Sequence, residues 1–207
     1  MAKRNTPIVF LLGVVTALAI GATVAPAANA SPMWKFGGKS LETIETVIGD
    51  ASKSALTIPS LTTTCKNIHY KMKIFNSGGT GQGDINEVLF EECSTGSACA
   101  VGSITAEKLP WHLHLTTLTP SDYVILEGVK ATILYEGEEC VLAETPVTIT
   151  GTAGGLFENL TSTMVFNAST FKTTKTELKA LGTKVEWSGL FSTEATGLHI
   201  GQSLSVS

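Results

Sequence analysis

Apolar and polar residues alternate with a period of two along much of this chain, and this alternation constrains the fold more than any other feature. The stretch "YVILEGVKATILY" shows it best: after a break at Gly128, one face carries Val129, Ala131, Ile133 and Tyr135. A period of two places successive apolar side chains on one side of a β-strand. Threonine, valine and isoleucine are abundant and charge is sparse, which is typical of β proteins. The stretch therefore predicts two strands, or one bent strand, of an all-β domain.

Further strands are expected on both sides of this stretch. "DINEVLFEEC" predicts one, introduced by the glycine-rich turn "SGGTGQG", and "TKVEWSGLF" and "GLHIGQSLSVS" predict the last ones. In "CVLAETPVTIT", Pro146 lacks the N–H that a central strand needs, so this strand is expected at an edge or at a bulge. Its apolar face carries Val141, Ala143, Val147 and Ile149.

Two short segments leave a helix open as an alternative. "SLETIETVIG" has apolar residues at helical spacing, and "TELKALG" ends in a glycine that suits the C-terminus of a helix. Both segments are short, and threonines dilute the first. A helix is therefore the less favoured alternative for each.

The first thirty residues have the layout of a secretory signal. Lys3 and Arg4 give a basic start, an apolar run follows from residue 8 to residue 22, and Pro26 ends it. Ala28 and Ala30 supply small residues at the two positions that signal peptidase recognises. We expect cleavage after Ala30, which makes residues 1–30 a signal peptide and residues 31–207 a single secreted or envelope-associated β domain. The alternative is a retained membrane anchor, for which the apolar run is short. No other run approaches membrane length, so no transmembrane span is expected after the signal is removed.

Charge limits the partners of the secreted chain. Lys3 and Arg4 leave with the signal, so 12 of the 14 basic residues remain against 18 acidic ones, a net charge of −6. Nucleic acids and anionic membranes are bound through concentrated positive charge, which this sequence lacks. Nucleic acid is therefore not an expected partner.

Four cysteines lie in the exported part of the chain, and an even count there predicts two disulfides. Zinc would require closer pairs such as C-x-x-C, which are missing from the sequence. The favoured pairing is Cys65–Cys93 with Cys99–Cys140, because each bond would then join segments predicted as separate strands. A Cys93–Cys99 bond across "CSTGSAC" is the main alternative.

The C-terminal third, from "VTITGTAGGLFENL" to "STEATGLHIGQSLSVS", resembles the tail of a group of exported actinobacterial proteins of unknown function. Members of that group resemble this chain in two further ways. A short "W…GG…L" segment stands near the start of the exported part, where Trp34, Gly37, Gly38 and Leu41 match it. Spaced cysteines precede the tail, as Cys65, Cys93, Cys99 and Cys140 do here. The resemblance implies a β-rich extracellular domain and transfers no catalytic residue.

Few side chains suggest chemistry. His112 and His114 in "WHLHLTT" fall on one side of a strand and could share a metal, although the opposite side, with Trp111, Leu113 and Leu115, explains the spacing equally well. Several glutamates flank cysteines in segments expected to be turns, where their oxygens could bind calcium, but the sequence has no calcium-binding loop motif. They are Glu91, Glu92, Glu136, Glu138 and Glu139. Trp34, Trp111 and Trp187 could stack on sugars, but core packing also explains the last two.

The stretch "TGTAGGLFENLTSTMVFNAST" combines glycines with two Asn-x-Ser/Thr triplets, at Asn159 and Asn167. A dinucleotide loop needs a G-x-G-x-x-G pattern before a helix, and a P-loop needs Lys-Ser/Thr after the glycines. Neither condition is met. Gly154 and Gly155 instead predict a tight turn between two strands, and the triplets are not expected to carry sugars in a bacterial host.

We expect an all-β, antiparallel β-sandwich or partly closed barrel stapled by two disulfides. No catalytic, cofactor-binding or metal-binding residues are predicted, and no cofactor is expected. The favoured function is a secreted or envelope-associated, non-enzymatic β module with a binding or structural role, for which cell-wall or extracellular polysaccharide is a candidate partner. The alternative is a secreted hydrolase acting on polysaccharide or peptidoglycan, which a carboxylate pair in a cleft would favour.

Overall fold

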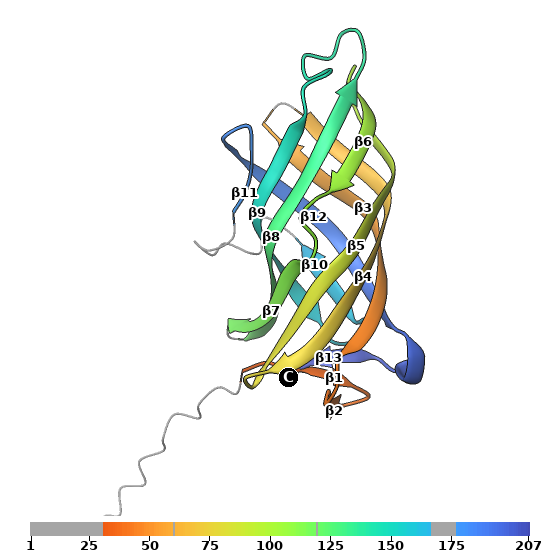
Figure 1. Cartoon of the computed structure of the whole chain (residues 1–207), viewed down its shortest axis with the longest axis vertical. Helices are drawn as coiled ribbons and strands as arrows, with labels where there is room; N and C mark the ends of the chain where they lie inside the picture. The colour runs from red at the N-terminus through yellow and green to blue at the C-terminus, as the bar shows by residue number, and fades with distance from the viewer. Residues whose placement is uncertain (1–30, 60, 119, 167–176) are drawn as a thin grey trace, which may run out of the picture.

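The computed structural model describes residues 31–59, 61–118, 120–166 and 177–207 and shows a closed antiparallel β-barrel (Figure 1). The prediction of an all-β antiparallel fold is confirmed, and the choice between sandwich and barrel falls on a barrel. In chain order the barrel strands are β3 (Glu45–Ile58), β4 (Leu61–Ser77), β5 (Thr80–Thr95), β6 (Ala100–Ala106), β7 (Trp111–Leu118), β8 (Ser121–Glu136), β9 (Val147–Glu158), β10 (Thr163–Phe166), β11 (Leu178–Ala180) and β12 (Thr183–Ala195). A small sheet of β1 (Trp34–Phe36), β2 (Lys39–Ser40) and β13 (Leu204–Val206) lies at one end.

Neighbouring strands follow one another in sequence, and the sheet closes where β12 pairs with β3 along nearly its whole length. Two of the eight positions around the barrel are shared by two short strands. β7 pairs with the first half of β8 and β6 with the second half, while β10 and β11 pair with different parts of both β9 and β12. Closure removes the free edges at which sheets otherwise aggregate.

The alternation predicted from the sequence is visible along β4, where Ile68, Tyr70, Met72 and Ile74 point inward and the residues between them point to solvent. β8 is one bent strand, with a register shift next to Gly128, whose φ is +71°. The apolar face predicted for this strand is buried throughout: Val129, Ala131, Ile133 and Tyr135.

The strand predicted from Val141 to Thr150 begins later than expected. β9 starts at Val147, directly after Pro146, and continues to Glu158. Val147 and Ile149 are buried as predicted, but Val141 is 90% exposed in the loop that precedes the strand. The alternation of apolar and polar residues extends N-terminal to Pro146 into a loop. The strand itself cannot extend there, because proline has no N–H to donate to the neighbouring strand.

The turn predicted at Gly154 and Gly155 is wrong, because both glycines lie inside β9. Gly155 is opposite Val124 of β8 and Phe166 of β10, and a Cβ there would come within 2.9 Å of the carbonyl oxygen of Val165. The chain turns instead between Glu158 and Thr163. At Gly155 the missing side chain allows close approach of a neighbouring strand rather than a positive φ angle.

Neither candidate helix forms among the described residues, where the one helical element is the short 3₁₀ turn η1 (Gly197–His199). In the first segment, Val47 is buried and its neighbour Ile48 points outward, which is the period of a strand. In the second segment, Leu181 and Gly182 form a two-residue hairpin loop between β11 and β12, both with positive φ. No helix in the described part of the chain is long and apolar enough to cross a membrane.

The two disulfides pair as favoured by the sequence, Cys65–Cys93 and Cys99–Cys140. Cys65 and Cys93 lie opposite each other on β4 and β5, as expected of a bond between strands. Cys99–Cys140 differs from expectation, since it joins the loop before β6 to the turn after β8. In the chain-entropy model, closing loops of these lengths stabilises the fold by about 4 kcal/mol each.

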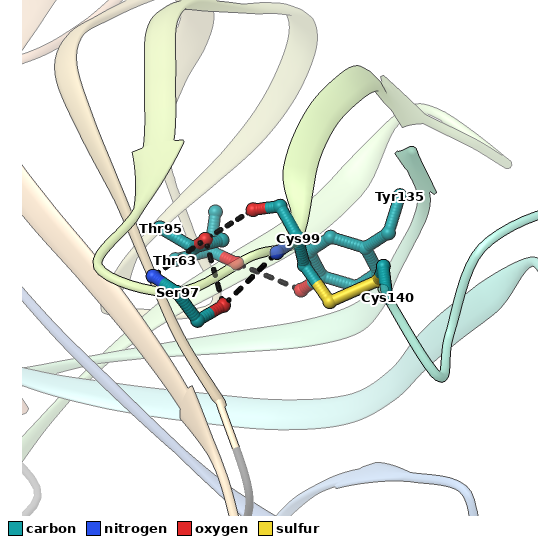
Figure 2. The surroundings of a disulfide bond; sticks show 6 residues. All are labelled: Thr63, Thr95, Ser97, Cys99, Tyr135 and Cys140. Carbon is teal, nitrogen blue, oxygen red and sulfur yellow. Dashed lines mark hydrogen bonds between the residues drawn. A yellow bond between two sulfur atoms is a disulfide. The ribbon is translucent and has the colours of Figure 1, made fainter. Parts of the chain in front are cut away.

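The Cys99–Cys140 disulfide lies at the upper end in Figure 1, where β6 begins and β8 ends, next to a buried hydrogen bond across the barrel interior (Figure 2). The hydroxyls of Thr63 on β4 and Tyr135 on β8 lie 2.7 Å apart, and burial raises the pKa of Tyr135. Beside Cys99, the hydroxyl of Thr95 donates a hydrogen bond to the Cys99 carbonyl oxygen and accepts one from the Ser97 amide at 3.3 Å. These contacts hold the loop over the end of the barrel.

The small sheet closes the lower end. The fully buried Trp34 inserts into the barrel, its indole N–H donates to the carbonyl oxygen of Gln82 at 2.8 Å, and its ring packs edge to face on Phe157.

Candidate functional site

The histidine pair predicted on one side of a strand lies on β7, and its two imidazoles bind different partners. His112 Nδ1 lies 2.7 Å from Asp84 Oδ1 on β5, whereas His114 Nδ1 lies 3.8 Å from Glu127 Oε1 on β8. Trp111, Leu113 and Leu115 fill the core on the opposite side, so core packing explains the spacing. Within the described residues, no three His, Cys, Asp or Glu side chains form a group that could hold a metal ion.

A third histidine, His69, bridges two carboxylates on the outer surface of the barrel. Its Nδ1 contacts Asp50 on β3, and its Nε2 lies 3.2 Å from Glu91 Oε2 on β5. The hydrogen bond to Asp50, assisted by the charge of both carboxylates, raises the pKa of His69. Both ring nitrogens of His69 are engaged, and all three side chains are largely exposed. The Asp50–His69–Glu91 contacts are therefore inter-strand ion pairs that contribute little to stability.

The acidic residues predicted in turns are distributed differently. Glu91 and Glu92 lie in β5, where Glu92 pairs with Lys66 at 2.5 Å, and Glu136 is the last residue of β8. Only Glu138 and Glu139 lie in a turn. Elsewhere, Glu107 has its pKa lowered by its hydrogen bonds from Lys130 and Thr132, which is the behaviour of a structural ion pair rather than of a general acid.

The three tryptophans do not form a surface platform. Trp34 and Trp111 are buried, and Trp187 packs between Phe166 and Phe191 while its N–H donates to the hydroxyl of Ser54. Stacking of a sugar on these three rings is therefore not supported.

Among the described residues, side chains point into the barrel interior and leave apolar cavities of about 40 and about 20 Å³, both bordered by Ile68, Trp111 and Trp187. Eight-stranded barrels are just wide enough for side chains to fill them or to hold one small ligand. An apolar cavity that takes up benzene measures about 150 Å³. The interior of this barrel therefore acts as a core.

A hollow of about 610 Å³ lies outside the barrel, beside the small sheet and η1. We call it the end hollow. It is bordered by Phe36, Gly37, Lys39, Ser40, Leu41, Glu42, Thr43, His199 and Gln202. Ligand pockets typically measure about 300–1,000 Å³ and combine an apolar surface with a few fixed polar groups. The end hollow has both properties, so it is the best candidate for a binding site.

A second hollow, of about 590 Å³, lies on the wall of the barrel over β3, β4 and β5. Its lining includes the His69–Asp50 pair and Lys71, which binds Glu87 at 3.2 Å. The charged groups of this groove are thus engaged with one another, although the buried side-chain oxygen of Asn86, which also lines it, has no hydrogen-bond partner among the described residues. The end hollow, which is slightly larger and combines aromatic with uncharged polar side chains, is the stronger candidate.

Two asparagines that the sequence did not single out as structural hold the small sheet in place. Asn76 accepts a hydrogen bond from the Trp34 amide at 2.8 Å and donates to the Trp34 carbonyl oxygen at 3.0 Å. Asn159 does the same for Val206, at 2.6 and 2.8 Å. Trp34 and Val206 are register partners in β1 and β13. Each side-chain amide therefore hydrogen-bonds both backbone groups of one residue of the small sheet, as a neighbouring strand would.

These contacts give the Asn159 triplet a structural role, because the nitrogen that would carry a sugar is bonded to Val206. The triplet at Asn167 and the predicted cleavage residues Ala28 and Ala30 lie outside the described residues. Local sequence could not have identified Asn159 as a clamp, since its partner is 47 positions away.

Replacing Asn159 by alanine is expected to destabilise the protein by about 1–3 kcal/mol, since two backbone groups of β13 lose their partner. Thr161→Ala is the matched control, because it destroys the same triplet while leaving the Asn159 amide intact. Urea unfolding measures both changes, and hydrogen exchange at the Val206 amide should accelerate only in the Asn159 variant. Equal stability of the two variants would contradict the clamp.

Comparison with known proteins adds no family. No family model, curated protein or solved structure matches this chain. The resemblance to exported actinobacterial proteins therefore stays a prediction. The end hollow is the feature of the barrel that bears on function.

Proposed function

We propose that this protein is a secreted or envelope-associated, non-enzymatic β module that binds a component of the cell wall or of extracellular polysaccharide. The end hollow carries this proposal, because it combines the size of a ligand pocket with fixed polar side chains on a rigid barrel. The interior cavities of about 40 and about 20 Å³ are too small for such a ligand.

An extracellular location is supported by two observations. All four cysteines are in disulfides, which persist in oxidising compartments outside the cytosol. The first thirty residues have the basic, apolar and small-residue regions of a signal peptide. On this proposal the working protein is the single domain of residues 31–207, and its excess of acidic residues does not favour nucleic acid as a partner.

A hydrolase is the second candidate, and one observation favours it. Glu42 borders the end hollow, and Glu45 contacts His199 beside it, with Glu45 Oε1 3.5 Å from His199 Nε2. Two carboxylates near one hollow are the minimum for glycoside hydrolysis. Glu45 also accepts a hydrogen bond from Thr43 at 2.8 Å, which suits a side chain held in place to orient others.

Incubation of the exported protein with purified cell-wall fractions tests both candidates. Retention on the insoluble fraction without release of soluble fragments is expected for a binding module. Release of reducing sugars that Glu45→Gln abolishes would establish the hydrolase instead. Absence of both retention and release would contradict the proposed function.

A further inference from the structure

We infer that the end hollow is a saccharide-binding site, in which the imidazole of His199, stacked on Phe36, supports the apolar face of a neutral sugar unit. This inference rests on the proposed function, since it names the ligand class and the side chains of that binding module. A pyranose presents C–H groups on its faces and hydroxyls around its edge. It therefore requires a flat apolar surface surrounded by groups that both donate and accept hydrogen bonds.

The flat surface is provided by the Phe36–His199 pair. The ring centroids lie 4.6 Å apart, and the planes are inclined by only 17°. Phe36 is buried, so it supports the imidazole from below, and the His199 side chain keeps 27% of its surface exposed. Both rings border the end hollow. A ring held flat against another loses little conformational entropy when a ligand stacks on it.

A hydrogen bond at one ring nitrogen and an ion-pair contact at the other orient the imidazole. Nδ1 lies 3.3 Å from Gln202 Oε1, and Nε2 lies 3.5 Å from Glu45 Oε1. Glu45 is itself held by the hydroxyl of Thr43. The side chains that surround the ring are thus positioned before any ligand arrives, which lowers the entropic cost of binding.

The polar edge of the end hollow matches hydroxyl groups better than charged ligands. Ser40, Thr43 and Gln202 offer groups that can both donate and accept hydrogen bonds. Glu42 and the neighbouring Glu45 disfavour anionic ligands, and Lys39 disfavours cationic ones. A neutral saccharide meets both conditions.

Exposed apolar side chains stand next to the lining residues in sequence. Ile44 follows Thr43, and Leu198 and Ile200 flank His199, with 64%, 92% and 75% of their surfaces exposed. Figure 1 shows the segment after β12 at the same end of the barrel as β1 and β2. These exposed side chains offer further apolar surface close in sequence to the lining residues, which suits a chain of sugar units over a single one.

The test is a titration of the ¹⁵N-labelled protein, expressed as the full chain and purified as exported, with tri-N-acetylchitotriose and separately with maltotriose. Saturable shifts of the Thr43, His199 and Gln202 amides are expected with at least one of the two. His199→Ala is expected to weaken binding about tenfold, the upper range for one aromatic stacking contact. Gln202→Ala, which leaves the stack intact, should weaken it less.

His114→Ala is the matched control, because it removes an imidazole from the outer wall, where His114 faces Glu127. Affinity should be unchanged in this variant, and circular dichroism of each variant shows whether the barrel remains folded. Shifts confined to other surfaces, or none with either saccharide, would overturn the inference even if His199→Ala fails to fold.

The outcome also separates this inference from the proposed function. Retention on cell-wall fractions that survives His199→Ala would leave the binding module standing and place its site elsewhere. A wild-type protein that is not retained on cell-wall fractions would contradict the proposed function itself.

Discussion

Replacing Trp34 by alanine is expected to lower the free energy of unfolding by about 3–5 kcal/mol, the range for aromatic-to-alanine changes in protein cores. The Trp34 side chain is fully buried where the small sheet meets the barrel, with its ring centroid 5.4 Å from that of Phe157. The alanine variant leaves a cavity at the lower end and removes the donor bonded to the Gln82 carbonyl oxygen. Urea unfolding followed by circular dichroism measures the loss without relying on tryptophan fluorescence.

Two further variants divide this effect into its parts. Trp34→Phe keeps an aromatic ring and loses the N–H, so a loss of about 1–3 kcal/mol is expected for the unpaired Gln82 carbonyl. Leu160→Ala, at a side chain that is fully exposed, should change stability by no more than about 0.5 kcal/mol. A Trp34→Ala protein as stable as the Leu160 variant would show that the small sheet does not close the barrel.

Replacing Gly49 by alanine is expected to cost roughly 3 kcal/mol or more, at the upper end of overpacking effects. A Cβ on Gly49 would lie 2.2 Å from the Ser192 carbonyl oxygen and 2.2 Å from Cζ of Tyr70. The Tyr70 ring crosses Gly49 to reach β12, where its hydroxyl donates to Ser192 O at 2.7 Å and contacts the Thr193 hydroxyl at 2.8 Å. Burial raises the pKa of Tyr70, so the phenol stays protonated and continues to donate.

The control is Gly96→Ala, since a Cβ there meets nothing within 4 Å. Its stability in urea should stay within about 0.5 kcal/mol of the wild type. The double variant Gly49→Ala/Tyr70→Ala is not expected to recover stability, because the Ser192 carbonyl remains in the way. Wild-type stability of Gly49→Ala alone would contradict the close packing of β3 against β12.

The parts of the fold that follow from local pattern could be predicted. The inward face of β8 is evident from the residues after Gly128, since alternation is a property of consecutive residues. The favoured pairing of the four cysteines rests on the assumption that each disulfide joins two separate segments of the chain. It is correct even though Cys99 and Cys140 lie in loops.

Some of the wrong predictions arise because the same residue type occurs in more than one kind of structure. Gly154 and Gly155 suggest a turn, but both lie inside β9, where the missing side chain of Gly155 allows close approach of β10. The candidate site could not be predicted from the sequence for a related reason. A histidine such as His199 suggests a metal ligand, and nothing in the sequence connects it to Phe36. Their contact depends on the docking of the small sheet.

The sequence alone determined that this chain forms antiparallel strands with one apolar face each, because side-chain alternation depends only on neighbouring residues. It also predicted the disulfides. Only the tertiary structure decided that the sheet closes, because closure requires β12 to pair with β3 from the other end of the chain. The same long-range packing brings Phe36, Glu45 and His199 together at the lower end. Contacts between segments so far apart depend on the geometry of the whole barrel, which no local pattern of residues encodes.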